Sequence, residues 1–587
     1  MAQILFDQVR DFTGGLNFRA DQFQLRNNES PFILNLDVDP RGGVFSRAAY
    51  RKKHTTQVSG NWNPKLLFNY KYPSAPRIIL STGKDGATDG KIYKSTGGDF
   101  STIEYSAGND IAVKSTNGAS VTTWQETLYM AIGKDATQMY YWNAGSTYAV
   151  ALAASGPTWQ PYQVPTGGYM PRAELARAHA NKLFVANTHE DGEAYPNRIR
   201  WSHENLPEDW FQDDYIDIIA GGEGIRGLAV VDGQLLIFKP KAVYLLMGYD
   251  ADSFQLVELS TTVGIQYPQH VVEGSGGAYF FDYPAGLLFF NRNGIQNVYD
   301  RLKPTIDTNR INAQKLDKLT LSYVNDRVWM SAPFDFDTDT QSSTSNPTGS
   351  AIDYSNVNFI YDPSIGAGGA FTLYQSATWY GGAATPVNLT GYGLLSGCDW
   401  TDATGEIYHL MINPNNSFKY VMYVDEYDFS DDIPQNTKDD VPEGDEEGDY
   451  ETIYTTSWFY DDRYVQDKTF VRSLYVVRPV DVLTEINVNV YHDFNTESPV
   501  TTHDVTLDPV ITGGVWGTGV FGTAVFGESD LQEGIQKGGR LKKAKAVQLK
   551  FQGPNVNLVG VDGPAGRQWG INSIAWKFKR RKVRSQR

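Results

Sequence analysis

The sequence predicts a mainly β protein, with an irregular β-propeller of six or seven blades followed by a β-sandwich-like platform domain. Its 587 residues are 13% aromatic and only 20% charged, and short aromatic or β-branched runs alternate with Gly, Asn, Asp and Pro. An apolar period of about 3.6 residues, the sign of a helix, is confined to 172–180 and 309–319. The runs also recur in pairs at the spacing of propeller blades.

Residues 1–60 precede this repeat and are predicted to form an N-terminal arm that packs with the C-terminal platform. Asp7, Arg10 and Asp11 lie where a signal peptide would need an uninterrupted apolar core. No later stretch approaches the ~18 consecutive apolar residues of a membrane span. We therefore expect a protein made in the cytoplasm, without a membrane anchor.

Residues 61–420 are predicted to form the propeller, because each repeat pairs a strongly apolar strand with a second strand that contains Tyr or Trp. The second strands begin 43 to 63 residues apart, and a propeller blade contains about 40–50 residues. A run of antiparallel sandwiches remains an alternative, since WD and kelch signatures are absent and only the period supports blades. The apolar strands are expected at 78–83, 128–133, 183–188, 235–240, 287–292 and 328–333, and their partners at 91–95, 139–143, 199–203, 242–246, 295–299, 358–362 and 406–410.

Residues 421–452 are predicted to form an acidic loop or linker. The stretch 425–451 contains 13 acidic residues and one Lys, together with Pro and Gly, in a chain whose net charge is −17. This composition is typical of a solvated segment rather than a packed element. The candidate functional residues of the acidic segment are Asp431, Asp432, Asp439, Asp440, Asp445, Glu446 and Glu447.

Residues 453–587 are predicted to form a separate β platform domain that includes a glycine-aromatic loop. In the sequence VWGTGVFGTAVFG at 515–527, Trp516, Phe521 and Phe526 each precede a glycine. Glycine permits tight turns and each ring offers a large apolar area, so these three side chains are candidate interface residues. Packing of the same rings into the core of the platform remains an equal alternative.

The C-terminal tail is strongly basic. Residues 577–587 contain seven Lys or Arg and no acidic residue, and Arg580, Arg581 and Lys582 are candidate interface residues. Basic clusters attract nucleic-acid phosphates, but they also pair with acidic surfaces or remain solvated. In an acidic protein, contact with an acidic surface of a neighbouring subunit explains the tail at least as well as contact with DNA.

The sequence contains no recognisable catalytic signature, so we predict no catalytic residue, no cofactor and no metal site, and expect that the protein is not an enzyme. GxSxG, HExxH and Walker motifs are absent. His189 and His203 have carboxylate neighbours, but they lie in a turn-rich region where exposed polar residues are ordinary. The phrase DFDTDT at 335–340 begins like a calcium loop but lacks the glycine and glutamate that such loops require. Cys398, the single cysteine, is expected to be an ordinary buried thiol.

Three patches of sequence carry a resemblance to a known family. The first, FTGGLNFRADQFQLRNNESPFILNLDVDPRGGVFSRAAYRK, contains Gly14, Gly15, Leu16, Asn35, Leu36, Asp37, Gly42, Gly43 and Arg47. The second, IRWSHENLPEDWFQ with GIRGLAVVDGQLLIFKPKAVYLLMG, contains Trp201, Ser202, Pro207, Trp210, Gly224, Gly227, Phe238, Lys239 and Tyr244. The third consists of TSWFYDDRY and KTFVRSLYVV. Together they resemble tail nozzle (tail tubular) proteins and related propeller-bearing tail proteins of tailed bacteriophages.

This resemblance implies a structural protein of the virion tail, assembled in the host cytoplasm as a homohexameric ring below the portal and adaptor. It also implies contacts with tail fibres or a tail tip protein, and a central channel through which double-stranded DNA passes without sequence specificity. Net acidity fits such a channel, because a negative wall repels DNA phosphates and lets the genome slide during ejection.

Two other functions remain open at this point. A tail hub or packaged-DNA stabilisation protein could use the same propeller. A carbohydrate-binding or glycan-hydrolysing propeller belongs to a different class, and an aromatic-lined pocket with convergent carboxylates would favour it.

Overall fold

The computed structural model describes most of the chain. The described residues are 4–20, 24–73, 76–152, 172–190, 192–211, 213–220, 222–250, 252–335, 354–366, 368–376, 392–415, 419–425, 431–432, 447–448, 452–460, 468–477, 484–507, 534–537, 543–553 and 569–580. No helix among them is both long enough and apolar enough to span a bilayer.

The predicted fold class is confirmed, because the chain is mainly β and most of it forms a propeller of antiparallel blades. Six separate four-stranded sheets form blades. The first three are β8–β11 (Pro64–Tyr70, Arg77–Thr82, Ile92–Ser95, Ser101–Thr102), β14–β17 (Ser120–Trp124, Thr127–Ala131, Tyr140–Trp142, Val150–Ala151) and β18–β21 (Arg172–His179, Lys182–Glu190, Glu193–Trp201, Tyr215–Asp217). The others are β22–β25 (Gly227–Val231, Gln234–Lys239, Ala242–Met247, Gln255–Ser260), β26–β29 (Val271–Gly274, Gly277–Asp282, Gly286–Asn291, Gly294–Asn297) and the sheet of β34, β35, β36 and β7 (Leu395–Thr401, Ile407–Ile412, Val421–Asp425, Ala49–Lys52).

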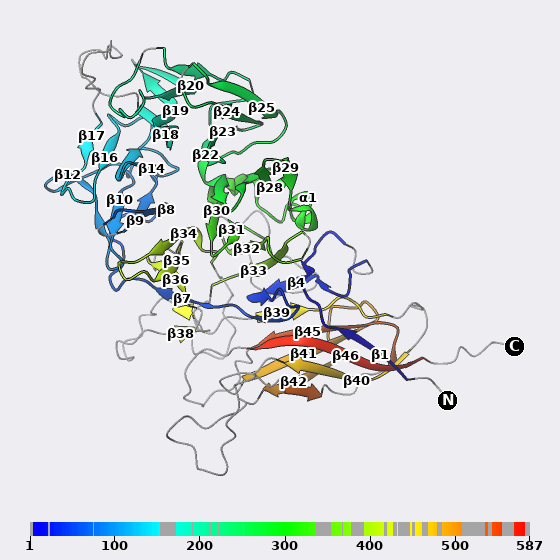
Figure 1. Cartoon of the computed structure of the whole chain (residues 1–587). Coiled ribbons are helices and arrows are strands. Elements are labelled where there is room, and N and C mark those ends of the chain that lie inside the picture. The colour runs from blue at the N-terminus through cyan, green and yellow to red at the C-terminus, as the bar shows by residue number, and fades with distance from the viewer. Residues whose placement is uncertain are drawn as a thin grey trace.

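A further four-stranded unit, β30–β33, lies in the ring between β26–β29 and β34–β36 (Figure 1). Its strands are Thr320–Val324, Arg327–Ala332, Val357–Asp362 and Ala370–Tyr374. Apolar side chains form a cluster at every boundary between neighbouring units. In one of them Leu80 of the first blade packs with Trp400 of the last, so the ring is closed by apolar packing.

The N-terminal region supplies the outer strand of the last blade. β7 pairs antiparallel with β36, which is followed by the acidic stretch. The propeller therefore extends beyond the predicted 61–420, because 49–52 and 421–425 both belong to its last blade. The predicted linker at 421–452 is therefore wrong at its first residues, because 421–425 form β36. The strand pairing ties the two ends of the propeller segment together.

One predicted helical signal is wrong. Residues 172–179 form the strand β18, which pairs with β19 along its length. Tertiary pairing overrides the local helical preference of the Ala, Glu and Leu residues in this segment. At 309–319 the chain forms only the 3₁₀ turn η3 (Ala313–Lys318). The other helical turns are η1 (Pro268–His270), η2 (Asp300–Leu302) and α1 (Pro304–Asp307).

The platform consists of two packed sheets built from both ends of the chain. Its first sheet contains β1 (Ile4–Val9), β5 (Leu36–Val38), β6 (Val44–Ser46), β40 (Lys468–Val477), β43 (Gly534–Lys537), β44 (Lys543–Ala544) and β46 (Gly570–Arg580). Its second sheet contains β4 (Phe32–Leu34), β39 (Thr452–Thr455), β45 (Val547–Gly553), β41 (Thr484–His492) and β42 (Thr501–Leu507). Three short pairs complete the strands: β2 (Gly15–Leu16) with β3 (Glu29–Ser30), β12 (Glu104–Ser106) with β13 (Asn109–Asp110), and β37 (Asp431–Asp432) with β38 (Glu447–Gly448).

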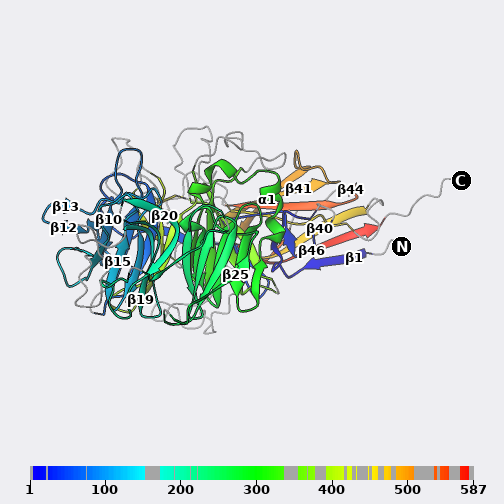
Figure 2. The same ribbon diagram turned by 90° about the horizontal axis from the view of Figure 1, so that it is seen from above.

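The platform core mixes residues that are more than 500 positions apart in the sequence. Val9 and Phe12 pack in the same cluster as Trp569 and Trp576, and β1 pairs antiparallel with β46. Figure 2 shows these strands projecting to one side of the propeller. The second platform sheet is continuous with β30–β33, because β4 lies between β33 and β39.

Candidate functional site

The segment 35–50 connects the platform to the propeller. Asn35 separates β4, in one platform sheet, from β5, in the other, and its φ of 54° turns the chain between them. Asparagine adopts this left-handed conformation more readily than most residues. Gly42 has a φ of 110°, and a Cβ there would lie 2.6 Å from the carbonyl oxygen of Arg10. Glycine is therefore needed where the β5–β6 hairpin packs on the first strand.

Arg47 is fully buried at this connection, with no exposed surface. Its Nε donates to Asn35 Oδ1 at 3.0 Å, and its terminal nitrogens donate to the carbonyl oxygens of Ala48 at 2.7 Å and Gln375 at 2.9 Å. The guanidinium also lies 4.0 Å from the ring centre of Tyr50. A buried charge is costly unless it is hydrogen-bonded, and these contacts meet that requirement with groups from the arm and from β30–β33.

A second arginine, the half-buried Arg327, lies beside the first. Arg327 Nη1 donates to Asp37 Oδ1 at 2.7 Å, and Arg327 Nε pairs with Asp362 Oδ2 at 3.1 Å. The hydroxyl of Tyr374 also donates to Asp37 Oδ1. We call these residues, with Asn35 and Arg47, the junction network. The bonds of Asp37 to Arg327 and Tyr374, and that of Arg47 to Gln375, cross from the N-terminal arm to the propeller.

The charge states of the junction network follow from its surroundings. The negative charge of Asp37 raises the pKa of the Arg327 guanidinium above its usual value. Burial acts in the opposite direction but is the smaller effect. Burial, followed by the Asp37 charge, raises the pKa of the Tyr374 hydroxyl well above 10. Tyr374 therefore stays neutral at physiological pH and can donate its proton to Asp37.

A pocket of about 290 Å³ opens at the junction network. Its walls come from the arm, from β30–β33 and from the last blade. The lining residues are Asp37, Phe45, Ser46, Ala48, Tyr50, Asn325, Arg327, Trp329, Tyr374 and Val424. We call this cavity the junction pocket. It is aromatic-lined, but Asp37 is the one carboxylate among its lining residues, whereas glycosidases use a pair.

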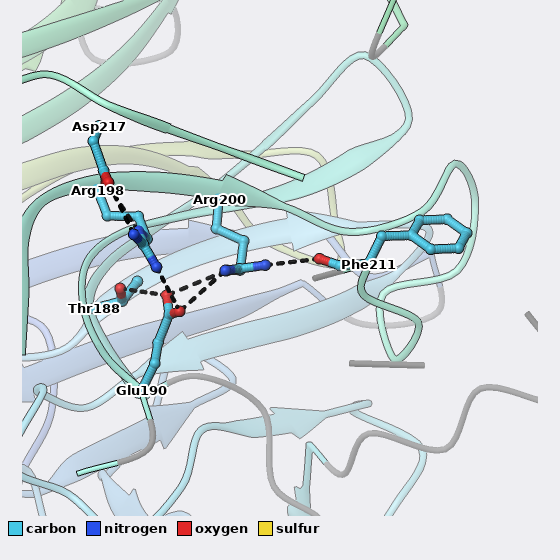
Figure 3. Close-up of polar contacts among 6 residues, drawn as sticks. All are labelled: Thr188, Glu190, Arg198, Arg200, Phe211 and Asp217. Atoms are coloured by element: carbon cyan, nitrogen blue, oxygen red, sulfur yellow. Dashed lines mark hydrogen bonds and ion pairs between the residues drawn. The ribbon is translucent and has the colours of Figure 1, made fainter. Parts of the chain in front are cut away.

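A second buried charge network lies within a single blade (Figure 3). Glu190, at the end of β19, accepts from Arg200 Nη2 at 3.0 Å and from Arg198 Nη1 at 3.1 Å. Arg198 also binds Asp217 through two nitrogens, at 2.9 and 2.8 Å. Thr188 donates to Glu190 at 2.7 Å, which completes what we call the blade network. Two arginines face two carboxylates, so the network is neutral overall.

The chain has no match among family models or curated proteins. A chain in the crystal structure of BBS1N in complex with ARL6DN is 8% identical, and the match covers 65% of this chain and 96% of that chain with a TM-score of 0.35. A chain in the crystal structure of the mitotic checkpoint complex is 11% identical, and the match covers 70% and 98% with a TM-score of 0.33. Similarities this distant identify no family.

Most of the interface and acidic residues predicted from the sequence lie outside the described residues. This applies to Trp516, Phe521, Phe526, Arg581, Lys582, Asp439, Asp440, Asp445 and Glu446. The backbone of Arg580 ends β46 and pairs with Lys468. Asp431 and Asp432 pair with Gly448 and Glu447 in the short β37–β38 sheet, so part of the acidic segment has regular structure.

The histidine and carboxylate groups weighed in the sequence have separate partners. The His189 ring contacts Arg172, whereas its neighbour Glu190 binds the two arginines of the blade network. Within the ranges that the structure describes, no three His, Cys, Asp or Glu side chains gather as metal ligands. Cys398 is half-buried, and burial raises the pKa of its thiol.

Sequence reasoning missed both arginine networks as sites. Asn35, Asp37 and Arg47 stood among the residues of the family resemblance, but no pattern linked them to Arg327 or Tyr374. A local signal did exist in the blade network, because Arg198 and Arg200 are two residues apart in a strand and so share one face.

Proposed function

We propose that the protein is a structural subunit of a bacteriophage tail nozzle, which forms a ring around a DNA-conducting channel below the portal and adaptor. The observation that carries this proposal concerns Asn35, Asp37, Gly42 and Arg47. These residues carry the resemblance to nozzle proteins, and in this chain they join the platform to the propeller. A rigid two-part subunit is what a ring under mechanical load during DNA ejection needs.

The arrangement of the chain supports a scaffold role. β1 and β46, from opposite ends of the sequence, pair in the platform, and β7 from the N-terminal region pairs with β36 in the last blade. The two described arginines that are fully buried, Arg47 and Arg200, bind protein groups. A catalytic site would instead be expected to leave charged groups available to a substrate.

In the proposed assembly the subunits form a homohexamer in the virion, and the ring contacts tail fibres or a tail tip protein on its distal side. The net acidity of the chain would repel DNA in such a channel or attract a basic tail of the next subunit. Double-stranded DNA passes through the channel in this proposal, and the protein does not recognise its base sequence.

Native mass spectrometry of the protein extracted from virions tests this function. The expected result is a ring of identical subunits, with six copies, alone or bound to the adaptor. Negative-stain imaging of the same sample separates a nozzle from a hub or a DNA-stabilising protein, because only a nozzle gives an open ring on the tail side of the portal. A protein that is monomeric in every sample, or absent from virions, contradicts the proposal.

A further inference from the structure

The junction pocket has features that the scaffold role does not use. Three aromatic side chains line part of the pocket, and their ring planes are steeply inclined to one another. The ring centres of Trp329 and Tyr374 are 5.4 Å apart with an interplanar angle of 79°, and those of Tyr50 and Trp329 are 6.4 Å apart with an angle of 56°. Such walls offer flat apolar faces to a guest. The volume of about 290 Å³ is close to the lower limit of ligand pockets and suits one small ring.

The polar groups of the pocket keep unused hydrogen-bonding capacity. Arg327 and Tyr374 both bind Oδ1 of Asp37, and within the described residues Asp37 Oδ2 has no hydrogen bond. Arg327 uses Nη1 and Nε, which leaves Nη2 without a partner in the same part of the chain. The backbone of Asn325 binds Asp399, but its side-chain amide has no bond to described residues. The pocket thus presents one acceptor and several donors.

The net charge of the side chains around the pocket determines which class of ligand it can bind. The two guanidinium groups of Arg47 and Arg327 balance the two carboxylates of Asp37 and Asp362. Neither an anion nor a cation gains net attraction from a balanced set. A neutral guest with hydroxyl groups can use the acceptor and the donors together, while an apolar face packs on an aromatic ring.

We propose that the junction pocket binds one ring of a neutral carbohydrate. The apolar C–H face of the sugar packs against Trp329 or Tyr374, and neighbouring hydroxyls donate to Asp37 Oδ2 and accept from Arg327 Nη2 and the Asn325 amide. Binding occurs without bond cleavage, because Asp37 is the one carboxylate of the lining and already holds two donors. The guest would also bridge the arm, β30–β33 and the last blade.

Binding is tested with the full-length protein and a panel of methyl glycosides of glucose, galactose, mannose, rhamnose and N-acetylglucosamine. Saturation-transfer NMR and titration calorimetry are expected to find at least one sugar with a Kd on the order of 1 mM. The proposal is overturned if none of the five binds at about 50 mM, roughly fifty times that Kd.

Two variants locate the site, and a third is the control. Asn325→Gly keeps the left-handed turn at φ 52° but removes the amide, and is expected to weaken binding about two- to tenfold, the effect of one hydrogen bond. Ala48→Leu fills the pocket and should abolish binding. Asp326→Gly changes the neighbouring residue of the same turn, which is exposed and outside the pocket lining, and should leave the Kd unchanged.

Melting curves check that each variant is folded. Sugar binding that survives both Asn325→Gly and Ala48→Leu places the site elsewhere and overturns the assignment. If no sugar binds but Ala48→Leu blocks ring formation, the pocket holds a side chain of a neighbouring subunit, and the carbohydrate proposal is wrong while the scaffold function stands.

Discussion

The junction network and the blade network use the same chemistry over very different sequence distances. Both bury arginines against carboxylates and carbonyl oxygens, yet Glu190, Arg198 and Arg200 lie within ten positions of one another, whereas Asp37 and Arg327 are 290 positions apart. The blade network can form as soon as one hairpin folds. The junction network can form only after the arm has packed against β30–β33. The first should therefore stabilise one blade, and the second should couple the two domains.

The largest effect is expected for Arg47→Ala. The change removes the charge-assisted hydrogen bonds to Asn35, Ala48 and Gln375, which costs about 3–5 kcal/mol of unfolding free energy. Differential scanning calorimetry should show that propeller and platform melt separately in the variant. The matched control is Arg41→Ala, because Arg41 is 87% exposed and its loss should leave both transitions at their wild-type temperatures. A single transition at the wild-type temperature would refute the coupling.

Glu190→Gln is expected to cost about 2–3 kcal/mol, but only locally. The substitution keeps the shape and the acceptor oxygen, yet it leaves two buried guanidinium groups with one fewer charge to balance them. Hydrogen exchange should speed up in β19 and β20 and stay unchanged in β5 and β31. Faster exchange across the whole molecule would show that the two networks do not differ as described.

Tyr374→Phe tests the pH dependence of the junction network. At neutral pH the loss of the hydrogen bond to Asp37 should cost about 1 kcal/mol. The pKa of Tyr374 is raised in the folded state, so its contribution is fully present below the ordinary pKa of about 10 and is lost as the pH rises above it. The stability difference between wild type and variant should therefore shrink above pH 10 in urea unfolding. A constant difference between pH 8 and 11 would contradict the proposed protonation state.

Asp217→Asn should have the smallest effect. The Asp217 side chain is 39% exposed, so solvent screens its pair with Arg198, and the expected cost is about 0.5 kcal/mol. The hydrogen bond to Arg198 lowers the pKa of Asp217, so this contribution is present above pH 3.8 and is lost as the pH falls below it. Denaturation at pH 7 and pH 3 measures both values. A cost at pH 7 equal to that of Glu190→Gln would mean that exposure does not separate the two carboxylates.

The sequence predicted what local patterns encode. Paired apolar and aromatic strands identified the blades, and their period implied a propeller, because each blade is a hairpin unit with its own alternation. The helical signal at 172–179 was misleading. Its alanines are compatible with a 3.6-residue period, but small side chains also suit a strand that packs closely against the neighbouring blade.

Contacts between distant segments were not predictable in the same way. Nothing local in 49–52 shows that it pairs with β36, or that Arg47 will meet the carbonyl of Gln375. These contacts depend on how the closed ring places the arm, which a single sequence does not record. The junction pocket shares this origin, because its lining comes from three separate parts of the chain.

Electron cryo-microscopy of the virion tests the central claim most directly. We predict a ring below the portal and adaptor whose subunits each fit the propeller with its laterally placed platform, and whose channel admits double-stranded DNA. Density for this fold at the tail nozzle would establish the function. A virion in which this fold is absent from the nozzle, or in which another chain forms the ring, would contradict it.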